Sequence, residues 1–508
     1  MADFDVLVVG GGINGVGIAR DLAGRGWRVL LAERHDLASH TSSASTKLIH
    51  GGLRYLEYRE FGLVRKALQE RERLLCAAPH LIHPLRFVMP HHPQMRPAWL
   101  LRLGLFLYDH LAHRELLPGS AGLRLAGHPL GAPLQPQFAR GFVYSDGWVD
   151  DARLVIANAI DARERGAEIL TRSPCLDARV AQGLWHARLQ APTGERRLTA
   201  RLLVNATGPW AARFVEQSLR GARGETPAAR RLRLVKGSHI VVPRLYDHDH
   251  AYLLQGADGR IVFTIPYQQD FTLVGTTDVE LAPADIDGGH TPGISGAEVD
   301  YLCEQAGRYF RQPLRPGDVR WSYAGVRPLL DDDAGTAAAV TRDYALDLDT
   351  AAGAPLLHVW GGKLTTYRRL AEEVADRIDA QLGGHHGAWT AGAPLPGADV
   401  SAWAPGAGRG PAALQALMQA VRARHPQLPA PLLQRLCQAY GGRIDRVLGP
   451  GTLGEEIAPG LHEAELRYLQ REEWAQTAED VLWRRSKLGL RCHPNDVERV
   501  AQALRSGT

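Results

Sequence analysis

The chain has 508 residues, of which 45 % are hydrophobic and 22 % are charged, and its formal net charge is +4. This composition is ordinary for a globular protein of two or three domains, and it excludes an intrinsically disordered or collagen-like chain. The small positive excess suits an anionic substrate or membrane surface, but no basic, aromatic-studded patch predicts a nucleic-acid partner.

The cysteines and histidines carry no metal or disulfide signature. Five cysteines are widely spaced and form no C-x-x-C pair, so we expect reduced thiols in a cytoplasmic protein. The 21 histidines are scattered without metal-ligand spacing, and we expect no metal site. No signal peptide precedes the first predicted strand, and no apolar run reaches the ~18–20 residues that a membrane span needs.

The N-terminus predicts a strand, a glycine-rich turn and a helix in direct succession. The apolar, β-branched run Phe4–Val9 leads into Gly10, Gly12 and Gly15, which fit the spacing G-x-G-x-x-G, and a helical pattern follows over residues 16–23. Such glycines let the backbone approach a pyrophosphate, and the helix N-terminus offers free N–H groups and a partial positive charge.

A second predicted strand completes this unit. Residues 28–32 are apolar and end in Glu33, where the dinucleotide-binding fingerprint places an acid for ribose hydroxyls. Asn14, inside the turn, is a further candidate for the cofactor site. Strand, turn, helix, strand and acid in this order predict a dinucleotide-binding βαβ unit.

The stretch that follows, residues 41–56, is dense in hydroxyl groups. Hydroxyls can hold phosphate and ribitol oxygens, and Gly51 with Gly52 would let the backbone lie against a flat ring. A solvated Ser/Thr loop is the plainer interpretation of this composition. The side chains of the stretch that we assign to cofactor binding are Thr41, Ser42, Ser45, Thr46 and Lys47.

A Leu-rich basic stretch, Arg96–Arg114, predicts an amphipathic helix. On a helical wheel its narrow side is polar and its broad side is formed by Leu100, Leu101, Leu103, Leu105, Leu107, Tyr108 and Leu111. Trp99 and Phe106 fall nearer the polar side. A broad apolar face with basic ends indicates a helix lying in a membrane interface, and a core or dimer-interface helix is the alternative.

Later segments return to strand patterns. Residues 150–166 predict an amphipathic helix, and the strand 200–204 leads into an A-T-G turn, where Thr207 and Gly208 are cofactor candidates. Residues 231–282 alternate in strand fashion and predict an antiparallel sheet. Beyond a Gly-, Ala- and Pro-rich linker at 391–410, about a hundred residues have helical patterns.

Four segments identify a family resemblance. The stretches His50–Leu56 and Gly361–Tyr367, with Arg86-Phe87 and Trp321–Pro328, closely resemble FAD-dependent glycerol-3-phosphate dehydrogenase, and the match is nearest to the bacterial aerobic, respiratory form. The resemblance extends from Asp5 to about Lys487. It implies FAD as the cofactor and sn-glycerol 3-phosphate as the substrate, oxidised at C2 to dihydroxyacetone phosphate.

The resemblance also implies an architecture. We expect an α/β fold in which a Rossmann-like FAD-binding domain is interleaved with an antiparallel-sheet substrate domain, followed by a C-terminal helical cap. The FAD parts are predicted at about 1–78, 146–215 and 318–390, the substrate parts at about 79–145 and 216–317, and the helical domain at 411–508. The sequence alone assigns no chemistry to the helical domain.

Two arginines are the candidates for binding the substrate phosphate. Arg54 and Arg327 each follow a turn-like Gly-Leu or Gly-Val pair, and the guanidinium fork matches phosphate oxygens. Tyr55 is expected to place a hydroxyl beside the same group. His239, on a predicted strand, is our first candidate for the base, and His50, next to the glycine pair, is its rival.

Lys363 is assigned a separate role. It precedes a predicted helix, and a helix N-terminus with an ammonium group can stabilise negative charge that develops on the flavin during hydride transfer. The same group can also contact the substrate. Gly362, Leu364 and Thr365 are assigned to the cofactor site with it.

The electron acceptor has more than one candidate. We expect a membrane quinone, reached by peripheral contact with the anionic inner face of the cell membrane. The alternatives are a glycerol-3-phosphate oxidase that uses oxygen and a related flavin amino-acid or amine oxidase. The sequence leaves a homodimer open.

Overall fold

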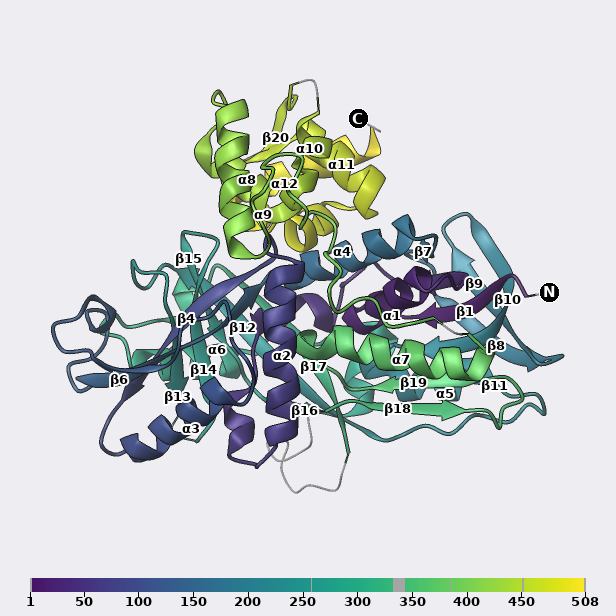
Figure 1. The fold of residues 1–508 in the computed structure, drawn as a ribbon, viewed down its shortest axis with the longest axis horizontal. Coiled ribbons are helices and arrows are strands. Elements are labelled where there is room, and N and C mark those ends of the chain that lie inside the picture. The colour runs from purple at the N-terminus through teal and green to yellow at the C-terminus, as the bar shows by residue number, and fades with distance from the viewer. Residues whose placement is uncertain (1, 257, 332–342, 385, 450–451, 507–508) are drawn as a thin grey trace.

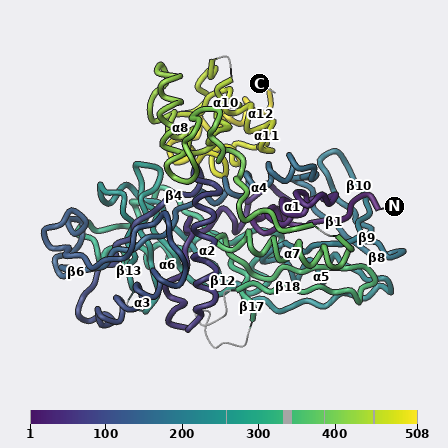
Figure 2. The backbone as a smooth tube through the Cα atoms, viewed as in Figure 1, coloured from purple at the N-terminus to yellow at the C-terminus, as the bar shows by residue number. Residues whose placement is uncertain are grey.

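A computed structural model of the chain describes residues 2–256, 258–331, 343–384, 386–449 and 452–506. Two large sheets lie side by side, and a helical C-terminal domain covers one end of both (Figure 1). The tube view shows the purple N-terminal segment beside the green segment that carries α7, although more than 300 residues separate them (Figure 2). The predicted fold class is confirmed by this arrangement of two sheets and a helical domain.

The first sheet has a parallel centre. Strand β1 pairs in parallel with β2 and β10, β7 continues beyond β2, and β19 lies beside β10. An antiparallel meander extends the sheet from β10 through β9 to β8. Its described strands are β1 (Phe4–Val9), β2 (Val29–Ala32), β7 (Glu168–Leu170), β8 (Cys175–Ala181), β9 (Leu184–Ala191), β10 (Gly194–Asn205), β11 (Leu219–Arg220), β18 (Ala345–Asp349) and β19 (Leu356–Trp360).

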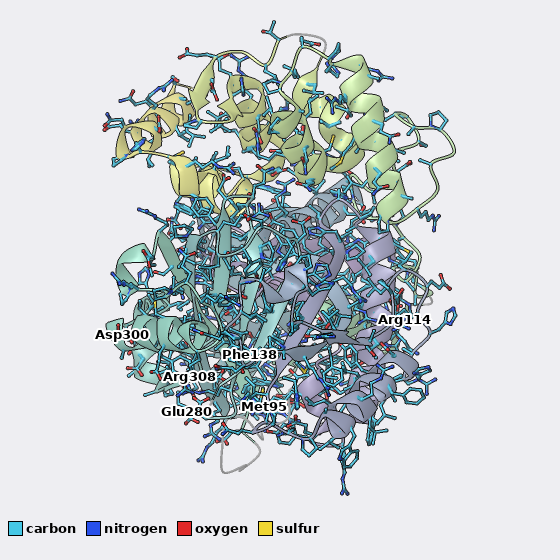
Figure 3. All side chains as sticks on the ribbon, turned by 90° about the vertical axis from the view of Figure 1, so that its left-hand side faces the viewer. Met95, Arg114, Phe138, Glu280, Asp300 and Arg308 are labelled. Atoms are coloured by element: carbon cyan, nitrogen blue, oxygen red, sulfur yellow. The ribbon has the colours of Figure 1, made fainter. Side chains whose placement is uncertain are left out.

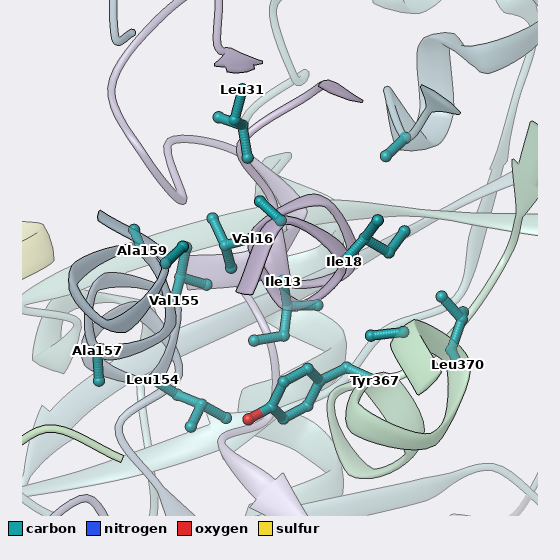
Figure 4. Packing of buried hydrophobic residues seen from close by; sticks show 14 of the residues in the cluster. Ile13, Val16, Ile18, Leu31, Leu154, Val155, Ala157, Ala159, Tyr367 and Leu370 are labelled. Carbon is teal, nitrogen blue, oxygen red and sulfur yellow. The ribbon is translucent and has the colours of Figure 1, made fainter. Parts of the chain in front are cut away.

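Three helices bury one face of this sheet. Helix α1 (Ile13–Gly24) lies between α4 (Asp151–Glu164) and α7 (Tyr367–Leu382), and the close view shows Val16 and Ile18 of α1 among apolar side chains of both neighbours (Figure 4). A β-carbon at Gly17 would come within 2.9 Å of the Tyr367 ring, so the glycine permits the close approach of α1 and α7. The carboxylate of Asp150 caps α4 by accepting the N–H of Arg153 at 3.2 Å.

The second sheet is mostly antiparallel. Its order runs β16-β12-β15-β14-β13-β4-β6-β3, with β17 beside β12 and β5 beside β6. The described strands are β3 (Leu48–Ile49), β4 (Ile82–His91), β5 (Ala121–Arg124), β6 (Arg140–Val149), β12 (Leu232–Pro243), β13 (Ala251–Gln255), β14 (Ile261–Tyr267), β15 (Phe271–Gly275), β16 (Val279–Leu281) and β17 (Trp321–Leu330). The helices around it are α2 (Phe61–Ala77), α3 (Ala98–His110) and α6 (Gly296–Gly307), whereas α5 (Ala211–Ser218) packs on the first sheet.

One predicted boundary differs from the structure. The chain was expected to re-enter the first domain near residue 318, but Trp321–Leu330 forms β17 in the second sheet. The reason is a long antiparallel register with β12, from Leu232 opposite Leu330 to Val241 opposite Trp321. The first sheet is rejoined only at β18.

The C-terminal domain has its own apolar core. Its elements are α8 (Pro411–Arg424), α9 (Ala430–Tyr440), α10 (Asp445–Leu448), β20 (Glu456–Ala458), β21 (Leu461–His462), α11 (Glu463–Glu473), the single π-helical turn η9 (Asp480–Arg485) and α12 (Pro494–Arg505). Buried ion pairs join it to the rest of the chain. Asp36, just after β2, binds Arg485 at 2.7 Å, and Arg153 of α4 pairs with Glu473.

The view turned by 90° shows that the helical domain spans the top of the molecule (Figure 3). Met95 and Arg114, which flank α3 in sequence, lie below that domain in this view.

None of the helices in the described part of the chain is both long and apolar enough to cross a membrane.

Candidate active site

A cleft at the carboxyl end of β1 has the geometry of a dinucleotide site. Gly10 has φ +112°, and a β-carbon there would lie 2.4 Å from the Ala206 carbonyl oxygen. A β-carbon at Gly15 would lie 1.9 Å from the Gly10 oxygen, so only glycine lets this turn close. Gly12 is the N-cap of α1 and has no side chain to occupy the first-turn N–H groups.

Residues from distant parts of the chain line this cleft. The predicted cofactor residues that line it are Gly10, Gly12, Asn14, Glu33, Thr41, Ser42, Thr207, Gly208 and Gly362. Asn14 donates from Nδ2 to the Gly361 oxygen at 3.1 Å, and its buried Oδ1 has no hydrogen-bond partner among the described residues. A polar acceptor left open in a glycine-lined cleft fits a cofactor that brings its own donors.

Glu33 is held tightly at the floor of the cleft. Its carboxylate accepts the Gly11 N–H at 2.6 Å and the His35 N–H at 2.7 Å. Burial raises the pKa of this carboxyl above its ordinary value, although the two N–H groups oppose the shift. The backbone bonds fix the turn and the end of β2 together, and contact of Glu33 with ribose stays a prediction.

The hydroxyl-rich stretch divides into two parts. Thr41, in the 3-10 turn η1 (Thr41–Ser43), donates to the Val326 oxygen at 2.7 Å, and the Ser42 hydroxyl accepts the Ile13 N–H at 3.0 Å. These two residues line the cleft, whereas the next ones turn away from it.

The second part of the stretch is anchored to α4. The fully buried Lys47 ammonium binds Asp151 at 2.7 Å, and the Ser45 hydroxyl donates to the same carboxylate at 2.7 Å. Burial alone would raise the pKa of Asp151, but the ammonium groups of Lys47 and Lys487 outweigh it and hold the pKa below the usual value. The Lys47 and Ser45 side chains therefore hold the loop against α4, and their assignment to cofactor binding stays a prediction.

The glycine pair that follows is fixed from two sides. His50 donates its N–H to the Thr365 hydroxyl at 3.2 Å, and Gly51 donates its N–H to the Tyr108 hydroxyl at 2.7 Å. Gly52 has φ +76° and begins the short helix η2 (Leu53–Leu56), which carries Arg54 and Tyr55. Tyr108 in turn donates to Asp146 at 2.7 Å.

The wall opposite is one face of the second sheet. His239 on β12 lies across from Gly275 on β15, and a β-carbon at Gly275 would come within 2.1 Å of the imidazole. Similarly, a β-carbon at Gly237 would meet the Arg327 guanidinium at 2.2 Å. The strand glycines thus leave the room in which the two functional side chains lie.

Arg327 and His239 are held by polar neighbours that the sequence did not reveal. Arg327 pairs with Asp278 and donates to the Thr276 hydroxyl at 3.0 Å. The Thr46 hydroxyl and His239 Nε2 are 2.9 Å apart. Thr276 and Asp278 could not be singled out because their contact with Arg327 depends on the sheet pairing.

The His239 imidazole is neutral at physiological pH. Burial lowers its pKa well below 6.5, and the positive charges of Arg327 and Lys47 lower it further. Its Nδ1 is buried without a partner among the described residues. A guanidinium can bind the anionic group of a substrate, and a neutral imidazole beside it can then accept a proton from a hydroxyl group of the same substrate.

Lys363 and Tyr55 meet at the third side of the site. The Lys363 ammonium lies 4.1 Å from the centre of the Tyr55 ring. Lys363 is the N-cap of η7 (Leu364–Thr366), which leads into α7. Among the described residues, no side chain pairs with the Arg54 guanidinium, so this half-buried cation is free to bind an anion.

Comparisons with known proteins agree on one family. A family model described as FAD dependent oxidoreductase matches residues 5–368, and one described as the C-terminal domain of alpha-glycerophosphate oxidase matches residues 388–505. The chain is 51 % identical to a glycerol-3-phosphate dehydrogenase of Pseudomonas aeruginosa, an alignment that covers 99 % of this chain and 95 % of that protein.

Other relatives are similar to the chain over its full length. It is 48 % identical to a D-erythritol 1-phosphate dehydrogenase of Brucella abortus (98 % and 96 % covered) and 46 % identical to the aerobic glycerol-3-phosphate dehydrogenase of Escherichia coli (98 % and 97 % covered). The solved structure of glycerol-3-phosphate dehydrogenase from Bacillus halodurans complexed with FAD has a TM-score of 0.75 at 24 % identity, with 99 % of this chain and 94 % of that one covered. This last likeness supports the fold.

Proposed function

Because the chain belongs to the FAD-dependent glycerol-3-phosphate dehydrogenase family, we propose that it oxidises sn-glycerol 3-phosphate at C2 and passes the electrons to a membrane quinone. The chain is an FAD-dependent oxidoreductase, and FAD supplies the hydride acceptor. The observation that carries the substrate assignment is the pairing of a neutral, buried imidazole with a guanidinium on two neighbouring strands.

The substrate phosphate is assigned to the cations. Arg327 has two of its N–H groups engaged by Asp278 and Thr276, which fixes the orientation of the guanidinium and leaves its other N–H groups for phosphate oxygens. Arg54 approaches from η2, next to Tyr55 and Lys363. A phosphate held between these elements would orient the adjacent carbon chain.

The C2 hydroxyl proton is assigned to His239. The Thr46 hydroxyl contacts Nε2 and so fixes the rotation of the ring. When this imidazole takes the hydroxyl proton, the hydrogen on C2 leaves with its electron pair, and C2 becomes a ketone carbon. His50 is held by its backbone to Thr365, and its role as the alternative base stays a prediction.

The reaction is tested by turnover with three substrates and two acceptors. We expect fast turnover of glycerol 3-phosphate with a quinone analogue, slow turnover with oxygen, and almost none of plain glycerol, which lacks the phosphate. Faster turnover of erythritol 1-phosphate would instead assign the chain the activity named for its Brucella abortus relative. Equal turnover with oxygen would make it an oxidase.

The exposed surface supports peripheral membrane contact. In α3 the residues Trp99, Leu103 and Phe106 are 69 %, 47 % and 50 % exposed, and their spacing places them on one helix face. Tyr58 and Phe61, which follow η2 in the sequence, are also exposed. Arg96, just before α3, pairs with Glu57 of the same segment. Isolated apolar side chains are common on surfaces, but a row of large ones indicates an interaction site.

The predicted helical wheel needs one correction. The broad leucine side does not face outward as a unit, because Leu105 and Tyr108 are buried against the second sheet. The outward face instead includes Trp99 and Phe106, which the wheel placed nearer the polar side. The Tyr108 hydroxyl accepts the N–H of Gly51, and this bond fixes the rotation of the helix. The sequence of the helix alone does not contain this constraint.

Arg327→Ala is expected to lower kcat/KM for glycerol 3-phosphate by roughly 30- to 1000-fold, since losing a charge-assisted phosphate contact costs about 2–4 kcal/mol. Bound FAD, measured by absorbance, should be unchanged. Arg315→Ala is the matched control and should retain normal turnover, because Arg315 is the N-cap residue of the short helix Pro316–Asp318 and does not line the cleft. An Arg327→Ala enzyme with unaltered kcat/KM would remove the phosphate assignment.

His239→Ala is expected to slow anaerobic flavin reduction by roughly 10²–10⁴-fold, whereas His50→Ala should do less. Because the pKa of His239 lies well below 6.5, its proton-accepting form is already present at pH 6. Wild-type flavin reduction at saturating substrate should therefore differ by less than about twofold between pH 6 and pH 7. Stopped-flow absorbance measures both effects, and a larger loss in His50→Ala would exchange the two roles.

Replacing Leu103 and Phe106 together with Glu should release the enzyme from anionic liposomes in a flotation assay. Turnover with a soluble dye should persist, because both side chains are exposed, while reduction of membrane quinone falls. Val497→Glu is the control, since Val497 is 40 % exposed on the C-terminal domain. Liposome binding by the double variant would place the membrane contact elsewhere.

A further inference from the structure

The C-terminal domain inserts an aromatic side chain next to the active-site sheet. The Trp483 ring, in η9, stacks on Trp321 with ring centres 4.3 Å apart and planes at 16°. The Trp321 and Tyr323 ring centres are 5.0 Å apart with their planes tilted by 43°, and Tyr323 stacks on His239 at 4.9 Å and 17°. These four residues, Trp483, Trp321, Tyr323 and His239, form a continuous ring column from the helical domain to the proposed base.

The strands keep this column in line. Tyr323 lies directly opposite His239 in the β12–β17 register, and Trp321 is two residues along on the same face of β17. A glycine lies against the ring at each end of the column. The imidazole lies over Gly275, and a β-carbon at Gly489 would come within 2.5 Å of the Trp483 ring. A side chain at either glycine would therefore displace the ring at that end of the column.

Three buried charged residues that follow Trp483 anchor its segment of the chain. Arg484 and Arg485 both bind Asp36 at 2.7 Å, and the fully buried Lys487 donates to the Trp483 carbonyl oxygen. Burial lowers the pKa of Lys487 to about 8. The docking contacts thus fix the position of the tryptophan against the second sheet, not only that of the domain as a whole.

We propose that Trp483 is a positioning residue, through which the C-terminal domain holds the His239 ring in the orientation that accepts the substrate proton. Trp483 is not among the residues that line the nucleotide cleft, and it acts through Trp321 and Tyr323. Without the outer ring, Trp321 and Tyr323 can tilt, and the imidazole loses the stacking partner that keeps Nε2 at the Thr46 hydroxyl. The inference rests on the proposed function of His239.

The test compares full-length Trp483→Leu, Trp483→Phe and Trp403→Leu. Trp403 is a buried tryptophan of the same domain outside the ring column. In Trp483→Leu we expect anaerobic flavin reduction at saturating glycerol 3-phosphate to slow by roughly 10- to 100-fold, the size expected for a displaced reacting group, with little change in substrate affinity. Trp483→Phe should restore the rate to within about threefold, because it keeps a ring in the column.

The pH dependence of flavin reduction separates positioning from loss of stability. The groups that face the imidazole are the Thr46 hydroxyl, the Tyr323 ring and the charges of Arg327 and Lys47, and Trp483→Leu retains all of them. If Tyr323 tilts, water can enter beside the imidazole. The acid limb of the rate profile should then move to higher pH. Trp403→Leu should lower thermal stability but leave the rate and the pH profile of the holoenzyme unchanged.

A wild-type rate and profile in Trp483→Leu would overturn the inference, while the proposed function would stand as long as the wild-type flavin is reduced by glycerol 3-phosphate. No reduction in the wild type would reject the proposed function itself. If Trp483→Leu does not retain FAD, Gly489→Ala decides, because its added methyl displaces the Trp483 ring and leaves every ring present. Slower reduction in that variant supports the inference, and an unchanged rate rejects it.

Discussion

The antiparallel pairing of β12 with β17 is the constraint on which the active site depends. Ten consecutive residue pairs set His239 opposite Tyr323 and Gly237 opposite Gly325, with Arg327 on the same face. Because side chains alternate along a strand, a one-residue slip of β17 against β12 would turn the Arg327 side chain to the face opposite His239. The glycines then decide which groups fit, since Gly275 and Gly237 leave the space that the imidazole and the guanidinium fill. The pairing of β12 with β17 thus positions His239, the proposed base, and Arg327, the proposed phosphate anchor.

Buried charge serves position more than stability in this protein. Asp36 between Arg484 and Arg485, Asp151 with Lys47, and Arg153 with Glu473 are all desolvated pairs that join separate parts of the chain. A buried pair recovers little net free energy, but removing one partner typically costs about 3–5 kcal/mol because the other charge stays buried alone. Such pairs tolerate few alternative arrangements. They therefore fix where the helical domain and the hydroxyl-rich loop sit relative to the two sheets.

Local signals made much of the fold predictable, and long-range pairing accounts for the rest. The order of strand, turn, helix and strand between Gly10 and Glu33 predicted the nucleotide cleft, because each of these elements is determined by residues close together in the sequence. Residues 321, 323, 325 and 327 also share a face by simple alternation, a signal that could have placed Tyr323 on the same face as Arg327. In contrast, the partners of Arg327 on the loop after β15, the Tyr108 bond to Gly51 and the contact of Trp483 with Trp321 each join distant segments. The prediction of which side of α3 faces outward was wrong for the same reason, because contacts with distant segments determine which of its apolar residues are buried.

The central claim is that this site removes hydrogen from C2 of glycerol 3-phosphate while FAD takes the electrons. The most direct measurement is anaerobic stopped-flow reduction of the bound flavin by glycerol 3-phosphate carrying deuterium at C2, compared with the unlabelled substrate and with substrate deuterated only at C1. The account predicts complete bleaching of the flavin, slower with deuterium at C2 than with the other two, and dihydroxyacetone phosphate as the product. An unbleached flavin, or a slower reaction only with deuterium at C1, would contradict it.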